Sequence, residues 1–208
     1  MNKPTKALID IDQLVYATAC VAQGKDEPDH HILHTAKLML DARIKEVMEL
    51  CPTVEKVFLF ISDKSNFRNN IAKEKKYKGQ RPPKPDAYEL VRDYIIKRGA
   101  SSRPWMEADD VTAMNHWASH VSGKYDTVLV DQDKDLDQIP GHRIVPSLRR
   151  GGKEVRQAEL KFITPEKGQL SFYKQLLMGD STDNIGGCLL YTSPSPRDRT
   201  RSRMPSSA

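Results

Sequence analysis

DTVLVDQDKDLD (residues 126–137) places a short, strongly apolar run directly before a series of carboxylates. A continuous apolar run of this length is typical of a strand buried in a parallel sheet. In open α/β sheets, functional side chains gather beyond the carboxyl ends of the strands. The stretch therefore predicts an α/β fold with a site at the end of this strand.

Two other runs end in the same way. KALIDID (6–12) contains Asp10, and VEKVFLFIS (54–62) leads directly into Asp63. HRIVPSL (142–148) is a candidate fourth strand. Helical patterns separate these runs, and strands that alternate with helices indicate a three-layer α/β/α fold with a mostly parallel sheet.

Four helices are predicted from apolar spacing and end signals. The first runs from about His34 to Leu50, and the second is capped by Asp86 and ended by Gly99. The third runs from Glu107 to Val121, and the fourth starts at Thr164-Pro165-Glu166 and ends before GDSTDN. We expect the following residues to face the core: Leu38, Ile44, Val47 and Met48 in the first helix, Leu90, Val91, Tyr94 and Ile95 in the second, and Val111, Met114, Trp117 and Val121 in the third.

Acidic residues form five separate clusters. They are Asp10/Asp12, Asp63, Glu107/Asp109/Asp110, Asp131/Asp133/Asp135/Asp137 and Asp180/Asp183. Like charges that meet in a fold repel and raise one another's pKa. A divalent cation that prefers hard oxygen ligands, usually Mg²⁺, keeps several of them ionised together. The clusters therefore predict a metal pocket and metal-assisted phosphodiester chemistry.

Each cluster also has a simpler interpretation. Acids in the first turn of a helix stabilise its dipole, which would account for MEADD (106–110). GDSTDN (179–184) could be ordinary turn chemistry, and Asp10 a satisfied strand-end residue. DQDKDLDQIPGH (131–142) resembles a calcium loop, but it has Leu136 at the glycine position and His142 at the glutamate position. It could also be a solvated loop, and one metal pocket would explain all five clusters together.

A basic segment lies between two of the acidic clusters. Its cations are Lys64, Arg68, Lys73, Lys75, Lys76, Lys78, Arg81 and Lys84, against Glu74 alone, with Phe67 and Tyr77 interleaved. Such a run is often only a solvated face. A loop that follows a strand-end acid would overhang the pocket, where its cations could neutralise phosphates and its aromatic rings could stack on unpaired bases.

Composition bounds the class of protein. The chain has 208 residues, enough for one sizeable domain, and a mean hydropathy of −0.62 without a long apolar run predicts no membrane span. MNKPTKALID contains no signal-peptide core, and the three cysteines have no metal-ligand spacing. We therefore expect a cytoplasmic protein.

The last 21 residues differ in character from the rest. CLLYTSPSPRD and SRMPSSA resemble the conceptual translation of a transposon-based sequencing adapter, and a disordered basic arm is the alternative. We expect a domain at residues 1–187 and a non-native tail at 188–208. The tail has four arginines against one aspartate, so residues 1–187 carry a formal net charge of about +2 rather than +5.

Six stretches appear together in one order, and the chain resembles the 5′-nuclease superfamily of flap endonucleases and phage 5′→3′ exonucleases, related to PIN domains. The stretches are LIDID, FISDKSNFR, YKGQR, MEADDV, DQDKDLDQIPG and LLMGDSTDNI. The match covers Ala7 to Gly187. The resemblance implies a PIN-like α/β/α core with a basic arch over the active site. The family's duplex-gripping hairpin would follow GDSTDN, where this sequence continues into the adapter-like tail.

The resemblance also implies roles for individual residues. The implied metal ligands are Asp10, Asp63, Glu107, Asp109, Asp110, Asp133, Asp135, Asp180 and Asp183. Asp12, Asp131 and Asp137 only flank these matches and are not expected to be ligands. Lys78 corresponds to the catalytic lysine of the arch, with Arg81 and Arg68 as supporting phosphate contacts. We expect Lys73, Lys75, Lys76, Tyr77 and Lys84, together with Arg68, to contact nucleic acid.

The implied activity is hydrolysis of DNA phosphodiesters at 5′ single-stranded ends or flaps with two Mg²⁺ ions, for which Mn²⁺ could substitute. We expect a monomer. The alternatives are a PIN-type ribonuclease and an inactive fragment that only binds DNA structures.

Overall fold

A five-stranded sheet forms the centre of the molecule. The structure, a computed structural model, describes residues 3–22, 27–72, 77–79, 81–150, 153–180 and 185–187. The strand order is β2-β1-β3-β4-β7. The strands are β1 (Lys6–Asp10), β2 (Lys56–Phe60), β3 (Thr127–Val130), β4 (Gly141–Val145) and β7 (Glu159–Ile163). The first four are parallel and β7 is antiparallel to β4, so the predicted mostly parallel sheet is confirmed.

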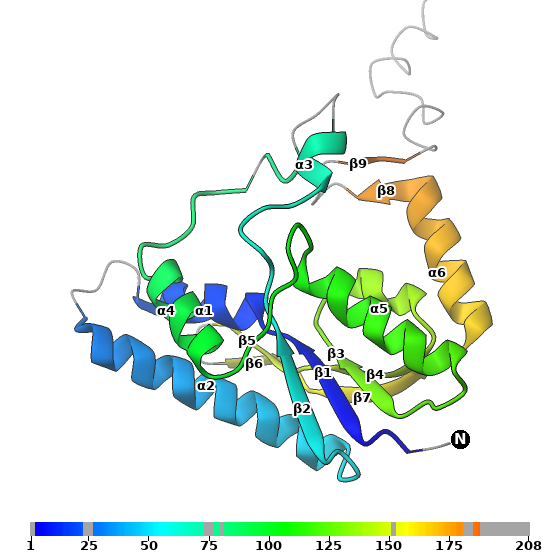
Figure 1. Cartoon of the computed structure of the whole chain (residues 1–208), viewed down its shortest axis with the longest axis horizontal. Coiled ribbons are helices and arrows are strands. Elements are labelled where there is room, and N and C mark those ends of the chain that lie inside the picture. The colour runs from blue at the N-terminus through cyan, green and yellow to red at the C-terminus, as the bar shows by residue number, and fades with distance from the viewer. Residues whose placement is uncertain are drawn as a thin grey trace, which may run out of the picture.

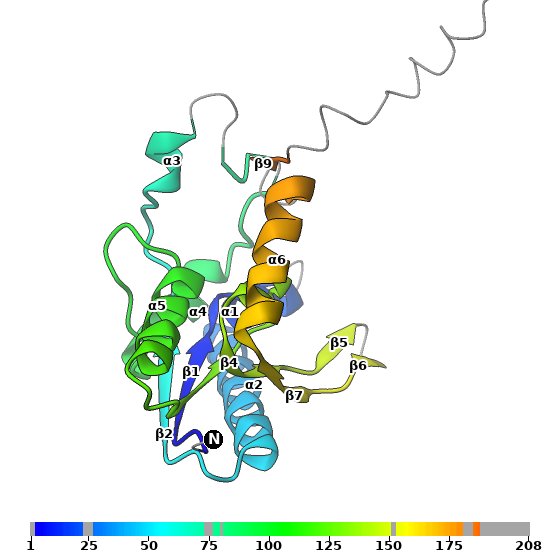
Figure 2. The same ribbon diagram turned by 90° about the vertical axis from the view of Figure 1, so that its right-hand side faces the viewer.

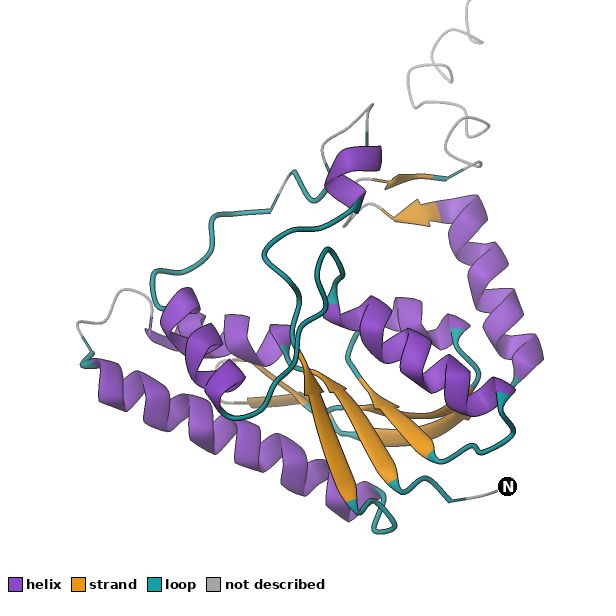
Figure 3. Ribbon diagram, viewed as in Figure 1, coloured by secondary structure: helices purple, strands orange, loops and turns teal. Residues whose placement is uncertain are grey.

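Helices cover both faces of this sheet, which is why the middle residues of β1 and β3 are apolar and buried. On one face lie α1 (Asp12–Ala22), α2 (Asp29–Leu50) and α4 (Tyr88–Lys97), which pack on one another. On the other face lies α5 (Ala108–Val121), which contacts β1, β3, β2 and β4 (Figures 1 and 3). All four residues of β3 are buried, as expected for a strand between two helical layers.

Two further parts lie near the carboxyl ends of the strands. The segment that connects β2 to α4 contains the short helix α3 (Arg68–Ile71) and stands beyond this edge (Figure 1). α6 (Pro165–Met178) rises from the β7 edge toward the same end of the molecule (Figure 2) and packs on the 3₁₀ helix η1 (Lys134–Gln138).

Two small two-stranded sheets complete the described elements. β5 (Leu148–Arg150) pairs with β6 (Lys153–Arg156), and β8 (Gly179–Asp180) pairs with β9 (Ile185–Gly186). Within the described residues, no helix combines the length and apolar character needed to cross a membrane. The predicted tail at 188–208 lies outside the described residues.

The helix ends agree only partly with prediction. Gly99 follows α4 with φ +100°, and Thr164 caps α6 by accepting a hydrogen bond from the Lys167 amide, so both of these end signals are confirmed. The predicted Asp86 cap is wrong, because α4 begins after Ala87 without a side-chain cap. α1 was not predicted.

Core faces were predicted correctly for α4 but not for α5 or all of α2. Val91 and Ile95 are buried, and Leu90 and Tyr94 pack against the core. In α2, Leu38 and Met48 are exposed. In α5, Val111 is buried as predicted, whereas Met114, Trp117 and Val121 are exposed. The face of α5 on the sheet instead carries Ala108, Val111, Thr112, His116 and Ser119.

Candidate metal centre

Asp10 and Asp131 lie side by side where β1 and β3 end. Ile9 pairs with Val130 in the parallel register, so the next residue of each strand carries a carboxyl group at the same edge. Burial and the charges of Asp131 and Asp12 raise the pKa of Asp10 well above its ordinary value. Burial also raises the pKa of Asp131 to about 6. The two groups therefore need a proton or a cation between them to be held together.

Asp131 had not been expected to contribute to the site. It is 4% exposed and is the immediate neighbour of Asp10 at the sheet edge. The signal that could have identified it is its position, because it follows a fully apolar strand just as Asp10 ends one.

A second acidic group lies in the first turn of α5 and just before it. One carboxylate oxygen each from Glu107, Asp109 and Asp110 lies within 4.8 Å of the others. Burial, followed by the charges of Glu107 and Asp110, raises the pKa of Asp109 to about 7. Among the residues that the structure describes, Glu107, Asp109 and Asp110 form the group of three acids that could hold a metal ion.

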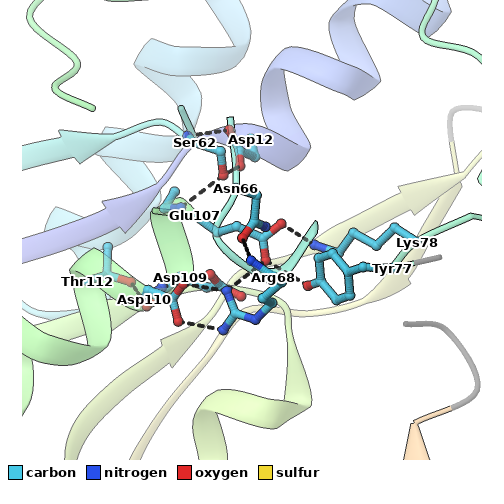
Figure 4. Close-up of polar contacts among 11 residues, drawn as sticks. Asp12, Ser62, Asn66, Arg68, Tyr77, Lys78, Glu107, Asp109, Asp110 and Thr112 are labelled. Atoms are coloured by element: carbon cyan, nitrogen blue, oxygen red, sulfur yellow. Dashed lines mark hydrogen bonds and ion pairs between the residues drawn. The ribbon is translucent and has the colours of Figure 1, made fainter. Parts of the chain in front are cut away.

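Cations from the segment after β2 contact this group directly (Figure 4). Arg68 binds both oxygens of Asp110 through Nη1 and Nη2, at 2.5 and 2.7 Å. Lys78 Nζ donates to Glu107 Oε1 at 2.6 Å, and the Tyr77 hydroxyl donates to Glu107 Oε2 at 2.8 Å. The bidentate hydrogen bonds to Asp110 raise the pKa of Arg68 further, so its charge is permanent.

The other predicted arch residues are less closely engaged. The backbone amide of Arg81 donates to the Lys78 carbonyl at 3.1 Å, and its side chain is exposed. Lys84 Nζ lies 3.9 Å from the centroid of the Tyr88 ring. Lys73, Lys75 and Lys76 lie outside the described residues. The predicted contacts of this segment with nucleic acid stay predictions.

Asp63 faces a neighbouring loop. Its Oδ2 accepts hydrogen bonds from Ser65 Oγ at 2.5 Å and from the Trp105 amide at 2.9 Å. These bonds, with the Ser65 hydroxyl as the largest cause, lower the pKa of Asp63. Asp63 is therefore an ionised residue that orders the loop before α5, and it lies outside the group of three.

The remaining predicted ligands follow β3 and α6. Asp133 caps η1 by accepting from the Asp135 amide at 3.0 Å. Burial and the charge of Asp133 raise the pKa of Asp135 to about 6, and Asp135 also interacts with Asp180. The structure thus brings Asp133, Asp135 and Asp180 near one another, while Asp183 lies outside the described residues.

Arg143 holds the loop that carries these acids. It is 1% exposed and donates to the backbone carbonyls of Asp131, at 3.3 Å, and Asp133. Its Nη1 also pairs with Asp137, which binds Lys161 Nζ at 2.6 Å as well. Asp137 is therefore engaged in ion pairs with Arg143 and Lys161, and its exclusion from the ligands stays a prediction. Arg143 was not predicted, because a lone arginine in a strand gives no sequence signal.

The donor set fits a divalent cation. Every side chain at the centre offers carboxylate oxygen, the ligand that hard divalent ions prefer. Burial and, after it, repulsion from Glu107 and Asp110 raise the pKa of Asp109, so its charged form is poorly stabilised by its surroundings. A bound cation would relieve that repulsion, as Arg68 and Lys78 partly do here.

The comparisons with known proteins bear on the relatives of this chain and on its fold. No family model matches the sequence. A curated 5′-3′ exonuclease of Buchnera aphidicola is 29% identical over 147 residues, which are 63% of this chain and 47% of that protein. The chain thus spans about half the length of this relative.

Solved structures show the same fold. Bacteriophage T5 5′-exonuclease with bound zinc matches with a TM-score of 0.55 and 15% identity, over 100% of this chain and 82% of that one. T5 flap endonuclease in complex with DNA and metal ions matches with a TM-score of 0.51 and 14% identity, over 98% and 81%. The fold class predicted from the sequence is confirmed.

Proposed function

We propose that this chain, a relative of the 5′-nucleases in sequence and fold, is a divalent-metal-dependent hydrolase of DNA phosphodiesters. It would act as a 5′→3′ exonuclease or flap endonuclease on 5′ single-stranded ends and flaps. The observation that carries the proposal is the group Glu107, Asp109 and Asp110, with oxygens within 4.8 Å, directly beneath the cations of Arg68 and Lys78. The name of the Buchnera relative supports the same activity.

Two groups of acids would each hold one metal ion. Glu107, Asp109 and Asp110 would hold one ion, together with Asp10 and Asp131 at the neighbouring strand ends. Asp133, Asp135 and Asp180 would hold a second. Two bound Mg²⁺ ions, or Mn²⁺ in their place, supply an activated water and charge stabilisation for the scissile phosphate.

The arch would bind and position the substrate. Lys78 Nζ lies at Glu107, where it would add positive charge beside a phosphate that gains negative charge in the transition state. Arg68 would exchange its bidentate contact with Asp110 for a phosphate, a group of matching geometry. The exposed ring of Phe67 offers a face for an unpaired base, whereas the Tyr77 ring is buried.

We further propose that residues 1–187 form the catalytic core and that 188–208 are a non-native tail. The protein would act as a monomer in the cytoplasm of a bacterial or phage-infected cell. Residues 1–187 carry a formal net charge of only about +2, so affinity for the phosphates of DNA would come from the local arch cations.

The test is cleavage of a labelled 5′-flap DNA by the 208-residue chain in Mg²⁺, compared with EDTA. Asp109→Asn should remove activity, because it takes a charged ligand from the centre of the acid group. Asp41→Asn, an exposed change on α2, should leave the rate unchanged. A matched RNA strand in competition separates a DNA nuclease from a PIN-type ribonuclease. Metal-independent cutting, or full activity in Asp109→Asn, would overturn the proposal.

A further inference from the structure

The N-terminus of α5 lacks the usual cap. Glu107 occupies the N-cap position, but its side chain makes no capping hydrogen bond to the helix. Its carboxylate instead binds Lys78 and Tyr77 in the site. Residues at this position normally use their own side chain to bind a free amide of the first turn. The amides of α5 therefore need another acceptor.

Ser62, just after β2, supplies that acceptor. Its Oγ accepts a hydrogen bond from the Ala108 amide at 2.9 Å, although it lies 46 residues away in sequence. The Ser62 carbonyl accepts from Arg92 Nη2, a buried α4 side chain, at 2.7 Å. Ser62 thus joins the end of β2 to both α4 and α5.

Asp12 orients Ser62. Asp12 Oδ1 accepts from the Ser62 amide at 3.0 Å, and Oδ2 accepts from the Ser62 hydroxyl (Figure 4). Because the Ser62 hydroxyl donates its proton to Asp12 Oδ2, a lone pair of Oγ stays available for the Ala108 amide. The Asp12 amide in turn donates to Asp10 Oδ1 at 2.8 Å. One chain of hydrogen bonds therefore connects Asp10 to the first turn of α5.

We propose that Ser62, oriented by Asp12, is the positioning residue that caps α5 from outside the helix and sets the geometry of its metal-binding carboxylates. The cap frees Glu107 to face the site. It also fixes Asp109 and Asp110, in the same turn, relative to Asp10 across β1 and β2. Neither Ser62 nor Asp12 needs to touch the metal or the substrate. This inference rests on the proposed metal-dependent function.

The probe is Mn²⁺ alone, titrated calorimetrically into the 208-residue chain. Loss of an outer hydrogen bond to a metal-binding group typically weakens metal affinity 10- to 100-fold. We expect a loss of about this size for Ser62→Ala. Ser62→Thr keeps the hydroxyl and should bind Mn²⁺ within about threefold of the unmodified chain. Ser122→Ala removes a serine hydrogen bond at the other end of α5 and should not change Mn²⁺ affinity.

A double-mutant comparison separates positioning from a direct charge effect. Asp12→Asn should weaken Mn²⁺ binding in the unmodified chain but change it little in the Ser62→Ala background, because Asp12 acts through Ser62. An equal effect in both backgrounds would assign Asp12 a direct role and overturn the inference. If Ser62→Ala does not fold, as judged by circular dichroism, Ser62→Cys takes its place in both comparisons, because a thiol sulfur is a weak acceptor for the Ala108 amide.

The outcomes distinguish this inference from the proposed function. If the unmodified chain binds Mn²⁺ but does not cut DNA, the proposed function fails, while the difference between Ser62→Ala and Ser122→Ala still decides the positioning role. If Ser62→Ala binds Mn²⁺ as tightly as Ser122→Ala, the positioning role is wrong. If the unmodified chain binds no Mn²⁺, both the proposed function and the positioning role of Ser62 are wrong.

Discussion

Lys78 holds a backbone conformation that a lysine rarely adopts. Its φ is +51°, in the left-handed region, and its side chain reaches Glu107 at 2.6 Å. Such a residue is strained and persists only where its surroundings hold it. Here the ion pair with Glu107 fixes the ammonium group above the acids.

Lys78→Ala should slow single-turnover cleavage by roughly 100-fold or more, because it removes a charge aimed at the transition state. The measurement is a rapid-quench assay with enzyme in excess over flap DNA. Lys56→Ala is the matched control, since it removes the same charge at the opposite end of the sheet. An unchanged single-turnover rate for Lys78→Ala would remove its proposed role.

His116 is a buried base far from the acids. Its Nδ1 lies 2.8 Å from Thr127 Oγ1, and its Nε2 is buried without a hydrogen-bond partner. Burial, followed by the nearby rings of His142 and His120, lowers the pKa of His116 to about 4. The unfolded chain takes up a proton near pH 6.5, whereas the folded chain resists it until about pH 4. The stability contributed by neutral His116 is therefore complete above pH 6.5 and is lost as pH falls toward 4.

The free energy of unfolding should accordingly fall by up to about 3 kcal/mol from this histidine between pH 6.5 and 4. His116→Gln should show a shallower acid decline in urea-unfolding series across that range. His34→Gln, an exposed change on α2, should keep the decline of the unmodified chain. Identical slopes for the unmodified chain and His116→Gln would contradict this assignment.

α6 approaches η1 through a glycine. A Cβ on Gly168 would lie 2.6 Å from the Gln138 carbonyl oxygen and 3.5 Å from Pro140 Cδ. Backbone cannot move away as a flexible side chain can. The close contact brings Gln175 and Asp180, at the far end of α6 and just after it, toward Asp135.

Gly168→Ala should destabilise the protein by roughly 1–3 kcal/mol, because the collision outweighs the higher helix propensity of alanine. In an exposed helix the same change would stabilise by about 1 kcal/mol. Urea unfolding measures the difference, with Lys174→Ala on the exposed side of α6 as the control for propensity. A gain of stability in Gly168→Ala would show that α6 does not pack on η1 in this way.

Elements that are marked by local sequence signals were predicted correctly. β1 and β3 are apolar runs that end in acids, and Thr164-Pro165 is a helix start whatever surrounds it. α5 was predicted with the wrong face, because Met114, Trp117 and Val121 form an apolar stripe that the fold leaves exposed. Thr112, His116 and Ser119 lie against the sheet together with Ala108 and Val111. Apolar periodicity could not reveal this face, because three of its five residues are polar.

The same limit applies to the site at the scale of the whole molecule. Motifs located the acids that the resemblance implies, each close to a strand or helix end. They did not assign these roles to Asp131, Arg143 or Ser62. The roles depend on which strands are neighbours and on hydrogen bonds between residues 10 to 50 positions apart. Sheet order is a tertiary property, so these contacts follow only from the assembled fold.

The proposed centre comprises two sets of carboxylates, which Asp131 joins because its Oδ1 accepts a hydrogen bond from the Asp133 amide at 2.5 Å. One is formed by Asp10, Asp131 and the acids at the start of α5, and the other by Asp133, Asp135 and Asp180. If each set holds one ion, calorimetric titration with Mn²⁺ should give two ions per chain.

Asp135→Asn should leave one ion bound and abolish DNA cleavage while DNA binding is largely kept, because the arch is untouched. Asp109→Asn should also leave one ion, at the other set, whereas Asp41→Asn should retain both. One ion in the unmodified chain, or cleavage by Asp135→Asn, would contradict a two-ion centre spanning both sets.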